Sequence, residues 1–398
     1  MRDCIRMIAT KTCRFTNTKN PNYLYIAEAS DIHLGHARTP TDFITTNLLK
    51  AFPDNAATAE LDIIIFAGDV FDQLITLPSE DVVTEAEIWI IEFLRMCAKY
   101  NIEVYIDEGT PRHDRKQCYL FDHVNRIFDI GATIVYAQRL QVYKSAKYSA
   151  SFLFVPDEWN PDHLETYREA VAAINAAGLE QVDFAIMHGA FEYQFPPNLE
   201  LPTHDSKLWL DIVKEWIFIG HVHTHSNYDR ILAAGSFDRL TFGEEEAKGH
   251  WRVKCRGLGK ESDEIKFVEN KHAMRYDTLD IEGVPLQDVV DRVTEANFKR
   301  GENLRLLCTK NCPAFFAERE LQNMFPDFRL VVKAKKIRAV EAPTQIDPLA
   351  PVRKVIAIDI TRDNVRRLME ARLKEAEKPL DGEHITRLLD LMEGVLNG

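Results

Sequence analysis

The most constraining feature of this 398-residue sequence is a repeated pairing of a short apolar run with a cluster of potential metal ligands. Each apolar run has the length and composition of a β-strand, and each cluster begins where its run ends. In chain order the clusters are Asp31-Ile32-His33, Gly68-Asp69-Val70-Phe71-Asp72, His113-Asp114, His188-Gly189 and Gly220-His221-Val222-His223. Because open α/β sheets gather ligand-binding groups at the carboxyl ends of their strands, the pattern predicts an α/β fold with one site built from all five clusters.

The composition is that of a globular protein, with 45% hydrophobic and 28% charged residues and no apolar run long enough to cross a bilayer. The basic first 22 residues lack the continuous apolar segment of a secretory signal. Seven cysteines without zinc-finger or C-x-x-C spacing favour a reducing compartment. We therefore expect a cytoplasmic protein without a membrane partner.

The formal net charge of −13 argues against a surface that is basic throughout, as proteins that bind nucleic acid non-specifically often have. It does not exclude nucleic acid as a substrate, because a metal centre or a local basic patch can bind phosphate.

The chain is expected to contain two or three domains. Residues 1–22 form an N-terminal arm or extra strand, and residues 23–272 alternate strands and helices as a layered α/β domain does. The expected strands are Tyr23–Ala27, Asp62–Ala67, Ile102–Ile106, Phe152–Val155, Asp183–Met187, Trp216–Ile219, Trp251–Cys255 and Glu264–Val268. The expected helices are Asp42–Phe52, Val82–Lys99, Pro161–Ala177 and Leu208–Val213.

A smaller α+β module is predicted over residues 273–340, followed by a proline-rich linker over 341–358. Its strands are expected at Arg275–Ile281, Leu304–Leu307 and Phe328–Ala334, and its helices at Leu286–Asn297 and Pro313–Met324. Residues 359–398 carry two apolar helical stripes that such a short tail cannot bury alone. The tail either folds back onto the main body or docks on a partner.

The residue types of the clusters predict a site for two divalent metal ions. A carboxylate can bridge two such ions, and Asp69 is the candidate bridge. Asp31 and His33 lie two residues apart on an extended segment and can bind one ion together, and His221 and His223 repeat that spacing. His188 would complete the second ion. Two ions about 3.5 to 4 Å apart clamp phosphoryl oxygens during in-line displacement, so phosphoester hydrolysis is the expected reaction.

His113 is predicted to be a catalyst and not a ligand. The adjacent Asp114 could fix its tautomer and raise its basicity, which suits His113 to protonate a leaving oxygen. Asp72 and Arg112 are candidates for contact with the substrate phosphate. Four further histidines lie outside the pattern and are interpreted as surface residues or supports of the ligands: His36, His204, His225 and His250.

These motifs resemble those of the calcineurin-like metallophosphoesterases, and within them the SbcD-type nuclease subunit of DNA double-strand-break repair complexes. The segment from Gly235 through Leu240-Thr-Phe-Gly-Glu244 to Gly249 is similar to the one that follows the last histidines in SbcD proteins. Gln73-Leu74 stands where protein phosphatases carry Arg-Gly. The sequence Gly109-Thr-Pro-Arg-His-Asp looks like the corresponding motif in SbcD-type subunits that large phages encode.

The resemblance implies a two-sheet α/β sandwich, a DNA-binding capping domain over 273–340, and C-terminal helices from 359 that bind the coiled-coil base of an SbcC-type ATPase. It implies Mn-dependent 3′-to-5′ exonuclease and single-strand endonuclease activity, with Mg as an alternative metal, in a complex that contains a homodimer of this subunit. Its cellular setting would be the cytoplasm of a bacterium or of a phage-infected host. The clearest basic cluster, Lys333, Lys335, Lys336 and Arg338, lies at the end of the expected cap, and a solvated face is its default interpretation.

The third motif departs from the family pattern Gly-Asn-His-Asp, in which the Asn ligates the second metal. Here Thr110-Pro111-Arg112 separates Gly109 from His113, so no Asn is present. Arginine stays protonated and cannot ligate. Thr110, Asp107 or Glu108 could substitute, or water could fill the position.

The working hypothesis is therefore a two-metal DNA nuclease subunit that acts with an SbcC-like ATPase. Two alternatives stay open. One is a stand-alone phosphodiesterase acting on a small phosphoester, and the other is a weakly catalytic scaffold for the ATPase, whose site holds metal.

Overall fold

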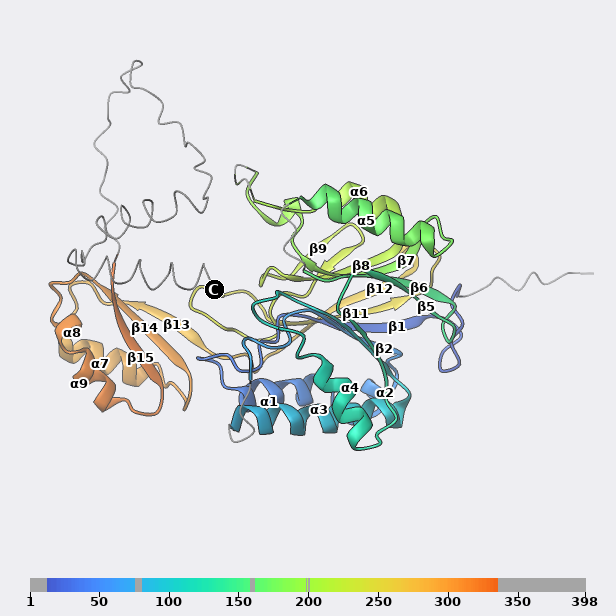
Figure 1. Ribbon diagram of the computed structural model, residues 1–398. Coiled ribbons are helices and arrows are strands. Elements are labelled where there is room, and N and C mark those ends of the chain that lie inside the picture. Colours follow the sequence, from blue (N-terminus) through green and yellow to red (C-terminus); the bar gives the residue numbers. More distant parts are fainter. Residues whose placement is uncertain (1–12, 76–80, 158–161, 198, 200, 336–398) are drawn as a thin grey trace, which may run out of the picture. The chain divides into compact units, whose positions relative to one another are not determined.

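The computed structural model describes residues 13–75, 81–157, 162–197, 199 and 201–335 (Figure 1). These residues form two six-stranded mixed sheets and a separate three-stranded sheet, with helices packed on them. The predicted linker 341–358 and helical tail 359–398 lie outside the described residues, as do residues 1–12 of the arm and 336–340 of the small module.

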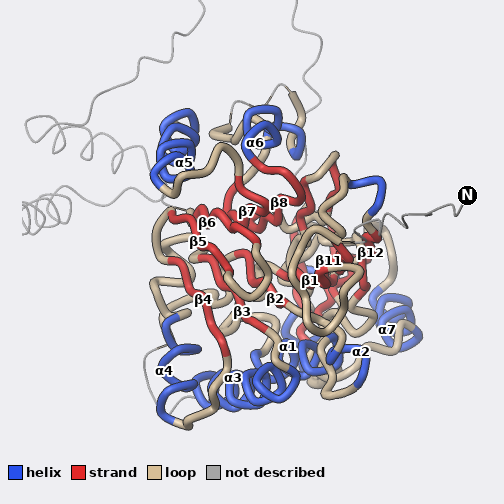
Figure 2. The backbone as a smooth tube through the Cα atoms, turned by 90° about the vertical axis from the view of Figure 1, so that its right-hand side faces the viewer, coloured by secondary structure: helices blue, strands red, loops and turns tan. Residues whose placement is uncertain are grey.

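The first sheet has the strand order β12-β11-β1-β2-β3-β4. Its parallel strands are β1 (Leu24–Ala29), β2 (Ile63–Ala67), β3 (Glu103–Asp107) and β4 (Thr133–Ala137). The strands β11 (Gly249–Cys255) and β12 (Glu264–Glu269) extend it in antiparallel pairing. Its helical face carries α1 (Thr41–Ala51), α3 (Asp81–Tyr100) and α4 (Tyr119–Ile127), with the short α2 (Ala56–Ala59) at the end of that layer (Figure 2).

All five residues of β2 are buried because both faces of the sheet are covered. Successive side chains of a strand point to opposite faces. Ile64 and Phe66 accordingly pack with the helices, whereas Ile63 and Ile65 pack against the second sheet.

The second sheet has the order β5-β6-β7-β8-β10-β9. Its strands are β5 (Gln141–Ser145), β6 (Ala150–Val155), β7 (Val182–Gly189), β8 (Val213–His221), β9 (Ser226–Tyr228) and β10 (Ile231–Ala233). The helices α5 (His163–Ala176) and α6 (Ser206–Ile212) cover its outer face (Figure 2). A 3-10 turn, Glu192–Gln194, follows β7, and another, Lys260–Ser262, lies between β11 and β12 of the first sheet.

A largely aromatic core joins the two sheets face to face. The rings of Phe152 and Phe184 stack with centroids 5.0 Å apart, and Tyr105 from the first sheet meets Phe152 edge-on at 4.9 Å. Each such buried aromatic ring stabilises the fold by roughly 2 kcal/mol. Arg14 of the N-terminal arm pairs with Asp183 at 2.8 Å and Glu215 at 2.9 Å, which fixes the arm to the second sheet.

The third sheet is wholly parallel, in the order β13-β14-β15. It consists of β13 (Tyr276–Asp280), β14 (Asn303–Cys308) and β15 (Arg329–Ala334). The helices α7 (Leu286–Glu295), α8 (Pro313–Phe316) and α9 (Glu318–Met324) lie on one face of it (Figure 1). This sheet and its helices share a core of their own, which includes Leu304, Leu306 and Val332.

The expected elements are found to within a few residues, except that one helix is divided, and the short α2, β9 and β10 were not expected, nor were the elements over residues 119–145. The helix expected over Pro313–Met324 is divided, because Ala317 has φ −92° and ψ 10° and ends α8 before α9 begins. No element was expected over residues 119–145, where α4, β4 and β5 lie, because these elements bury few residues and so leave a weak apolar pattern. No helix of the described residues has the length and apolarity needed to cross a membrane.

Candidate metal centre

The five polar clusters meet at the carboxyl ends of parallel strands. Asp31 follows β1, Asp69 follows β2, and the segment from Thr110 follows β3. His188 and His221 stand at the ends of β7 and β8, so the two sheets contribute to one site. The backbone N–H of His221 donates to both carboxylate oxygens of Asp31, at 2.9 and 3.1 Å, and joins the two sheets there.

Four of the candidate ligands have left-handed backbone conformations. The φ angles are 49° at Asp31, 55° at His33, 49° at Asp69 and 104° at His221. Each such residue costs about 1 to 3 kcal/mol and persists only where its surroundings hold it. Hydrogen bonds from the N–H of Asp31 to Gly68 O (3.1 Å) and from that of His33 to Asp69 O (3.0 Å) supply this restraint.

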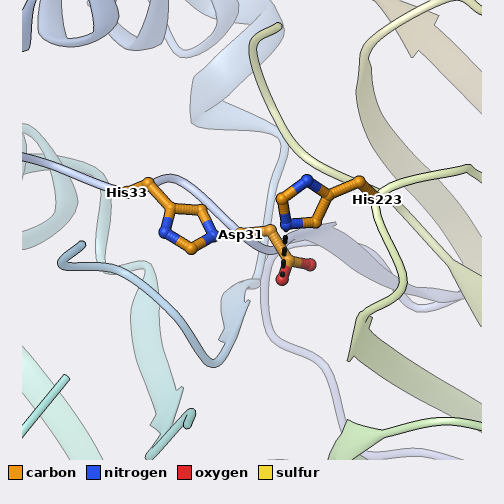
Figure 3. A group of neighbouring side chains, drawn as sticks. All are labelled: Asp31, His33 and His223. Atoms are coloured by element: carbon orange, nitrogen blue, oxygen red, sulfur yellow. Dashed lines mark ion pairs between the residues drawn. The ribbon is translucent and has the colours of Figure 1, made fainter. Parts of the chain in front are cut away.

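The first group of ligands is Asp31, His33 and His223, whose ligand atoms lie within 4.8 Å of one another. Figure 3 shows the imidazole of His223 directly above the Asp31 carboxylate, with the imidazole of His33 to one side. Nε2 of His223 is 3.9 Å from Oδ1 of Asp31. Asp31 is fully buried and His33 is nearly so, so this group could hold a cation with little competition from water.

The second group is Asp69, His188 and His221, and Asp69 connects it to the first. Oδ2 of Asp69 lies 3.4 Å from Nε2 of His188 and 3.8 Å from Nε2 of His33. The structure therefore brings together all six predicted ligands, with Asp69 in the position expected of a bridge.

Thr110, one of the three residues that could replace the absent asparagine, lies beside the second group of ligands. Its hydroxyl lies 3.2 Å from Oδ2 of Asp69 and 3.4 Å from Nε2 of His188, and its N–H donates to Oδ1 of Asp69 at 2.6 Å. Glu108 instead accepts from Tyr136 and from the N–H of Lys116, away from this group. Asp107 is fully buried, and its charge interacts with that of His188. Thr110 and Asp107 are therefore both residues whose oxygen could join the second group of ligands.

The imidazoles are oriented by oxygen atoms bound to their Nδ1 atoms. Nδ1 of His33 meets Asp72 Oδ1 at 3.1 Å, Nδ1 of His188 meets Ala67 O at 2.8 Å, and Nδ1 of His223 meets Glu244 Oε1 at 3.1 Å. An Nδ1–H that donates to such an oxygen leaves Nε2 unprotonated and directed at the centre, as a metal ligand requires.

Glu244 contacts a candidate ligand of this centre, His223, although its place in the sequence did not indicate that contact. It lies in the segment between β10 and β11, and its second oxygen accepts from Leu240 N at 3.0 Å and pairs with the buried Lys248 at 3.2 Å. Although burial opposes ionisation, the hydrogen bond from His223 and the charge of Lys248 lower the pKa of Glu244 to about 2. Glu244 is therefore an anion that positions His223.

His113 lies beside this centre, and one of its ring nitrogens is within 4.8 Å of ligand atoms of His33 and Asp69. Its ring is 4.9 Å from the ring of His33, and its Nδ1 is 2.6 Å from Asp72 O. The role expected for Asp114 is wrong: its two oxygens accept from Phe71 N and Gly109 N, both at 2.8 Å. Asp114 is thus held inside the loop by backbone groups, and the carbonyl of Asp72 fixes the tautomer of His113.

The two candidates for contact with the substrate phosphate, Asp72 and Arg112, have different surroundings. The carboxylate of Asp72 is engaged with His33, and a second anion would repel a phosphate. Arg112 is exposed and next to His113 in the loop. The side chain of Arg112 therefore remains a candidate for contact with the substrate phosphate.

Two observations fit the presence of divalent cations. Nε2 of His33 is buried without a hydrogen-bond partner among the described residues, which costs about 1 to 3 kcal/mol unless a ligand satisfies it. Burial opposes a charge on His188, yet the charge and hydrogen bond of Asp69 raise its pKa well above the ordinary range. The potential at this point favours a positive charge, and carboxylate oxygens with imidazole nitrogens are donors that divalent transition metals bind.

The four histidines outside the pattern take no part in either group. His250 is fully buried against Phe52, with ring centroids 4.8 Å apart, and His204 is buried beside Trp209 at 5.3 Å. Their interpretation as surface residues or ligand supports is therefore wrong for these two. His225 stacks on Phe267 at 4.2 Å, and His36 accepts from the N–H groups of Arg38 and Thr39.

No model of a protein family and no curated protein matches the sequence. Among solved structures, one crystal structure matches 63% of this chain and all of its own chain, with 14% sequence identity and a TM-score of 0.37. That likeness is too slight to carry an argument.

Proposed function

We propose that this chain hydrolyses phosphodiester bonds in DNA with two divalent metal ions, and that its fold is that of the metallophosphoesterases. The observation that supports this most strongly is the position of Asp69, which lies with His188 and His221 in one group of possible ligands and with His33 and His113 in another. Two ions held in this way would supply Lewis-acid activation of the phosphoryl group and of the attacking water.

The side chains have distinct tasks in this proposal. Asp31, His33 and His223 would hold one ion, His188, His221 and Thr110 would hold the other, and Asp69 would contribute to both. Asp72 and Glu244 keep the imidazoles of His33 and His223 in orientation.

His113 is the proposed general acid. Its Nδ1–H donates to Asp72 O, which leaves Nε2 as the atom that carries the transferable proton when the ring is charged. Transfer of that proton to the leaving oxygen completes the break of the phosphodiester bond.

By resemblance, we further propose that the chain is the nuclease subunit of an SbcCD-like complex, with 3′-to-5′ exonuclease and single-strand endonuclease activity. Mn is the proposed metal, with Mg as the alternative. The proposed partners are DNA, a second copy of the chain and a coiled-coil ATPase that binds the tail 359–398, in the cytoplasm of a bacterium or infected host.

The test is metal-dependent cleavage by the full chain. With Mn²⁺ it is offered linear duplex DNA, single-stranded DNA and bis-p-nitrophenyl phosphate, alone and with the ATPase. We expect cleavage that Asp69→Asn abolishes and that the exposed control Asp54→Asn retains. Failure of the wild-type chain to cleave any DNA in either setting overturns the proposal, and turnover of the small ester alone favours a stand-alone phosphodiesterase.

A second variant separates catalysis from metal binding. His113→Ala should lower kcat roughly 10²-fold or more while the bound metal is retained, because a general acid contributes about that factor. His123→Ala, an exposed histidine of α4, is the matched control. Unchanged kcat in His113→Ala contradicts the assigned role and favours a scaffold.

A further inference from the structure

Lys248, the residue directly before β11, is a cation that the proposed mechanism does not use. Its side chain is 1% exposed, although lysine is almost never fully buried unless it is paired. Its Nζ atom lies 2.6 Å from Oε1 of Glu246, 2.9 Å from the backbone carbonyl oxygen of His223 and 3.2 Å from Oε2 of Glu244. The three N–H groups of this ammonium group therefore have three acceptors.

The burial of Lys248 separates it from the side chains that could touch substrate. An ammonium group whose donors are all engaged, on a side chain that is 1% exposed, is not open to a phosphate from solvent. In the described part of the chain, no hydrogen bond or ion pair joins Lys248 to a candidate metal ligand other than His223. An effect of Lys248 on the centre would therefore pass through His223.

Lys248 reaches His223 from two sides. It donates directly to the backbone carbonyl oxygen, which also accepts from the N–H of Ser236 at 3.1 Å. It pairs with Oε2 of Glu244, whose other carboxylate oxygen lies 3.1 Å from Nδ1 of His223. The main chain and the imidazole of this one ligand are thus both attached to the ammonium group of Lys248.

The backbone between β10 and β11 is fitted closely to the carbonyl group of His223. Gly235 has a φ of 69°, and a Cβ added there would lie 2.5 Å from that carbonyl oxygen. Glycine is the residue that combines this conformation with so close an approach. The contact between this segment and His223 therefore depends on the residue types on both sides of it.

The orientation of the Glu244 carboxylate decides which nitrogen of His223 carries the hydrogen. Oε2 is held by Lys248 and by the N–H of Leu240 at 3.0 Å, which leaves Oε1 facing Nδ1 of His223. Because a carboxylate accepts hydrogen bonds, the hydrogen lies on Nδ1, and Nε2 keeps a lone pair for a metal ion. Without Lys248, the carboxylates of Glu244 and Glu246 would have no cation between them, and their repulsion would turn Glu244 away from His223.

We propose that Lys248 is a positioning residue of the candidate metal centre, which holds His223 as the Nδ1–H tautomer and so sets the affinity for one of two metal ions. The affected ion is the one assigned to Asp31, His33 and His223. The ion of the second group keeps its affinity. This inference rests on the proposed function for the metal ions, whereas the tautomer of His223 is a property of the chain alone.

The effect on metal binding is measured by isothermal titration of the full chain with Mn²⁺. Lys248→Met keeps a long apolar side chain, and it should weaken one of two sites by about 10- to 100-fold, as loss of a ligand's outer partner does. The other site should bind as in the wild type. Arg14→Met is the matched control, because Arg14 also pairs with two carboxylates, those of Asp183 and Glu215, outside the centre. This control should bind both ions as the wild type does.

The tautomer is measured by ¹⁵N NMR of the metal-free full chain labelled at histidine, at a pH where the ring is neutral. The signals of His223 are those that disappear in His223→Gln. The wild type should show hydrogen on Nδ1, and Lys248→Met should shift the signals towards the Nε2–H tautomer. Arg14→Met should leave them unchanged. A lysine that only stabilised the fold would have no effect on this tautomer.

Glu244→Ala provides a second variant, which cuts the link to Nδ1 and leaves Lys248 paired with Glu246. It should weaken the same metal site, so the inference can be tested even if Lys248→Met does not fold. Unchanged affinities in both variants, equal losses at both sites, or the same losses in Arg14→Met overturn the inference. An unchanged tautomer in folded Lys248→Met also overturns it.

The same measurements separate this inference from the proposed function. If the wild-type chain cleaves DNA with Mn²⁺ and Lys248→Met retains both affinities and the tautomer, the inference fails while the proposed function stands. If the wild-type chain binds two Mn²⁺ ions but cleaves no phosphodiester, and Lys248→Met loses one site, the proposed function fails while the positioning role stands.

Discussion

At the scale of single residues, the candidate centre depends on how each imidazole is held. His33, His188 and His223 each use Nδ1 to contact an oxygen, supplied by Asp72, a backbone carbonyl and Glu244 in turn. Three unrelated partners thus produce one result, an Nε2 atom directed inward. Such partners fix the tautomer and affect metal affinity almost as strongly as the ligands do.

Thr110 offers the sharpest residue-level test. Thr110→Val keeps the shape of the side chain and removes the hydroxyl near Asp69 and His188. We expect Mn²⁺ affinity at one of two sites to fall by about tenfold in isothermal titration calorimetry, within the range known for lost metal contacts. The exposed Thr294→Val is the control. Unchanged affinity in Thr110→Val would mean that water, and not this hydroxyl, completes the second group.

The sequence alone could predict the ligands but not their supports. Asp31, His33 and His188 are residue types that bind metals and stand at strand ends, so their chemistry and spacing are visible. Glu244 lies 21 residues beyond His223, and Asp114 lies next to His113 without contacting it through its carboxylate. Which carboxylate meets which imidazole depends on loop conformation, which residue spacing does not encode.

At the scale of elements, the turns after the strands require particular residue types, as the ligand positions do. Gly68 follows β2 with φ 80°, and a Cβ added there would lie 2.1 Å from Nδ1 of His188. The carbonyl of Ala67, at the end of the same strand, holds that Nδ1 atom. The turn therefore needs glycine both for its backbone conformation and for the close approach of the imidazole.

The steric part of this requirement can be separated from the conformational part. Gly178 has a similar φ of 70°, and a Cβ there would meet nothing within 4 Å. In urea unfolding, Gly178→Ala should cost about 1 kcal/mol from backbone strain. Gly68→Ala should cost several kcal/mol, because it also displaces buried His188. Equal losses for the two variants would show that the contact with His188 is unimportant.

His250, a residue of β11, is expected to make the stability of the fold depend on pH. It is fully buried against Phe52 and accepts from Nε of Arg252 at 3.1 Å, and burial, with the charge of Arg252, lowers its pKa to about 3. The unfolded side chain titrates near about 6.5, so between these values only the unfolded chain binds the proton. The contribution of His250 to the free energy of unfolding is complete above the pKa of the unfolded side chain, about 6.5. This contribution falls by about 1.4 kcal/mol per pH unit as the pH decreases from about 6.5 toward 3.

This pH dependence is measured by urea unfolding at pH 7, 6 and 5. The wild-type chain should lose stability more steeply than His250→Gln, which has no titrating ring. Exposed His272→Gln should keep the wild-type slope. A wild-type slope in His250→Gln would contradict a buried neutral imidazole.

Strands and helices were largely predictable where their burial is strong and regular. β2, whose five residues are all buried, was expected to within one residue. The strands β4 and β5 have half-exposed residues and gave no clear pattern, and the break at Ala317 has no glycine or proline to signal it. Local sequence thus identifies the elements that pack deeply and misses those whose limits are set by tertiary contacts.

At the scale of the described molecule, two sheets bring distant segments of chain to one centre. β1 lies between β2 and β11, although β11 is more than 200 residues away in sequence. The loops after β1, β2 and β3 of the first sheet meet those after β7 and β8 of the second sheet at this centre. The sequence predicts that strands end in ligands, but strand order depends on long-range pairing that no local pattern contains.

The distribution of charge is also a property of the whole chain. Acidic residues outnumber basic ones by 13, yet a cavity beside the third sheet is lined by cations alone among its charged residues. Lys333 and Lys335, whose default interpretation is a solvated face, line this cavity, while Lys336 and Arg338 lie outside the described residues. A chain that is acidic overall can therefore still carry a local concentration of positive charge.

The central claim, that one centre holds two metal ions through Asp69, is tested most directly by counting ions. Mn²⁺ binding to the full chain is measured by isothermal titration calorimetry and by metal analysis after gel filtration. The account predicts two ions per wild-type chain, and weaker binding of both in Asp69→Asn because each group loses the shared carboxylate. One ion or none in the wild type, or two ions bound with unchanged affinity in Asp69→Asn, would contradict it.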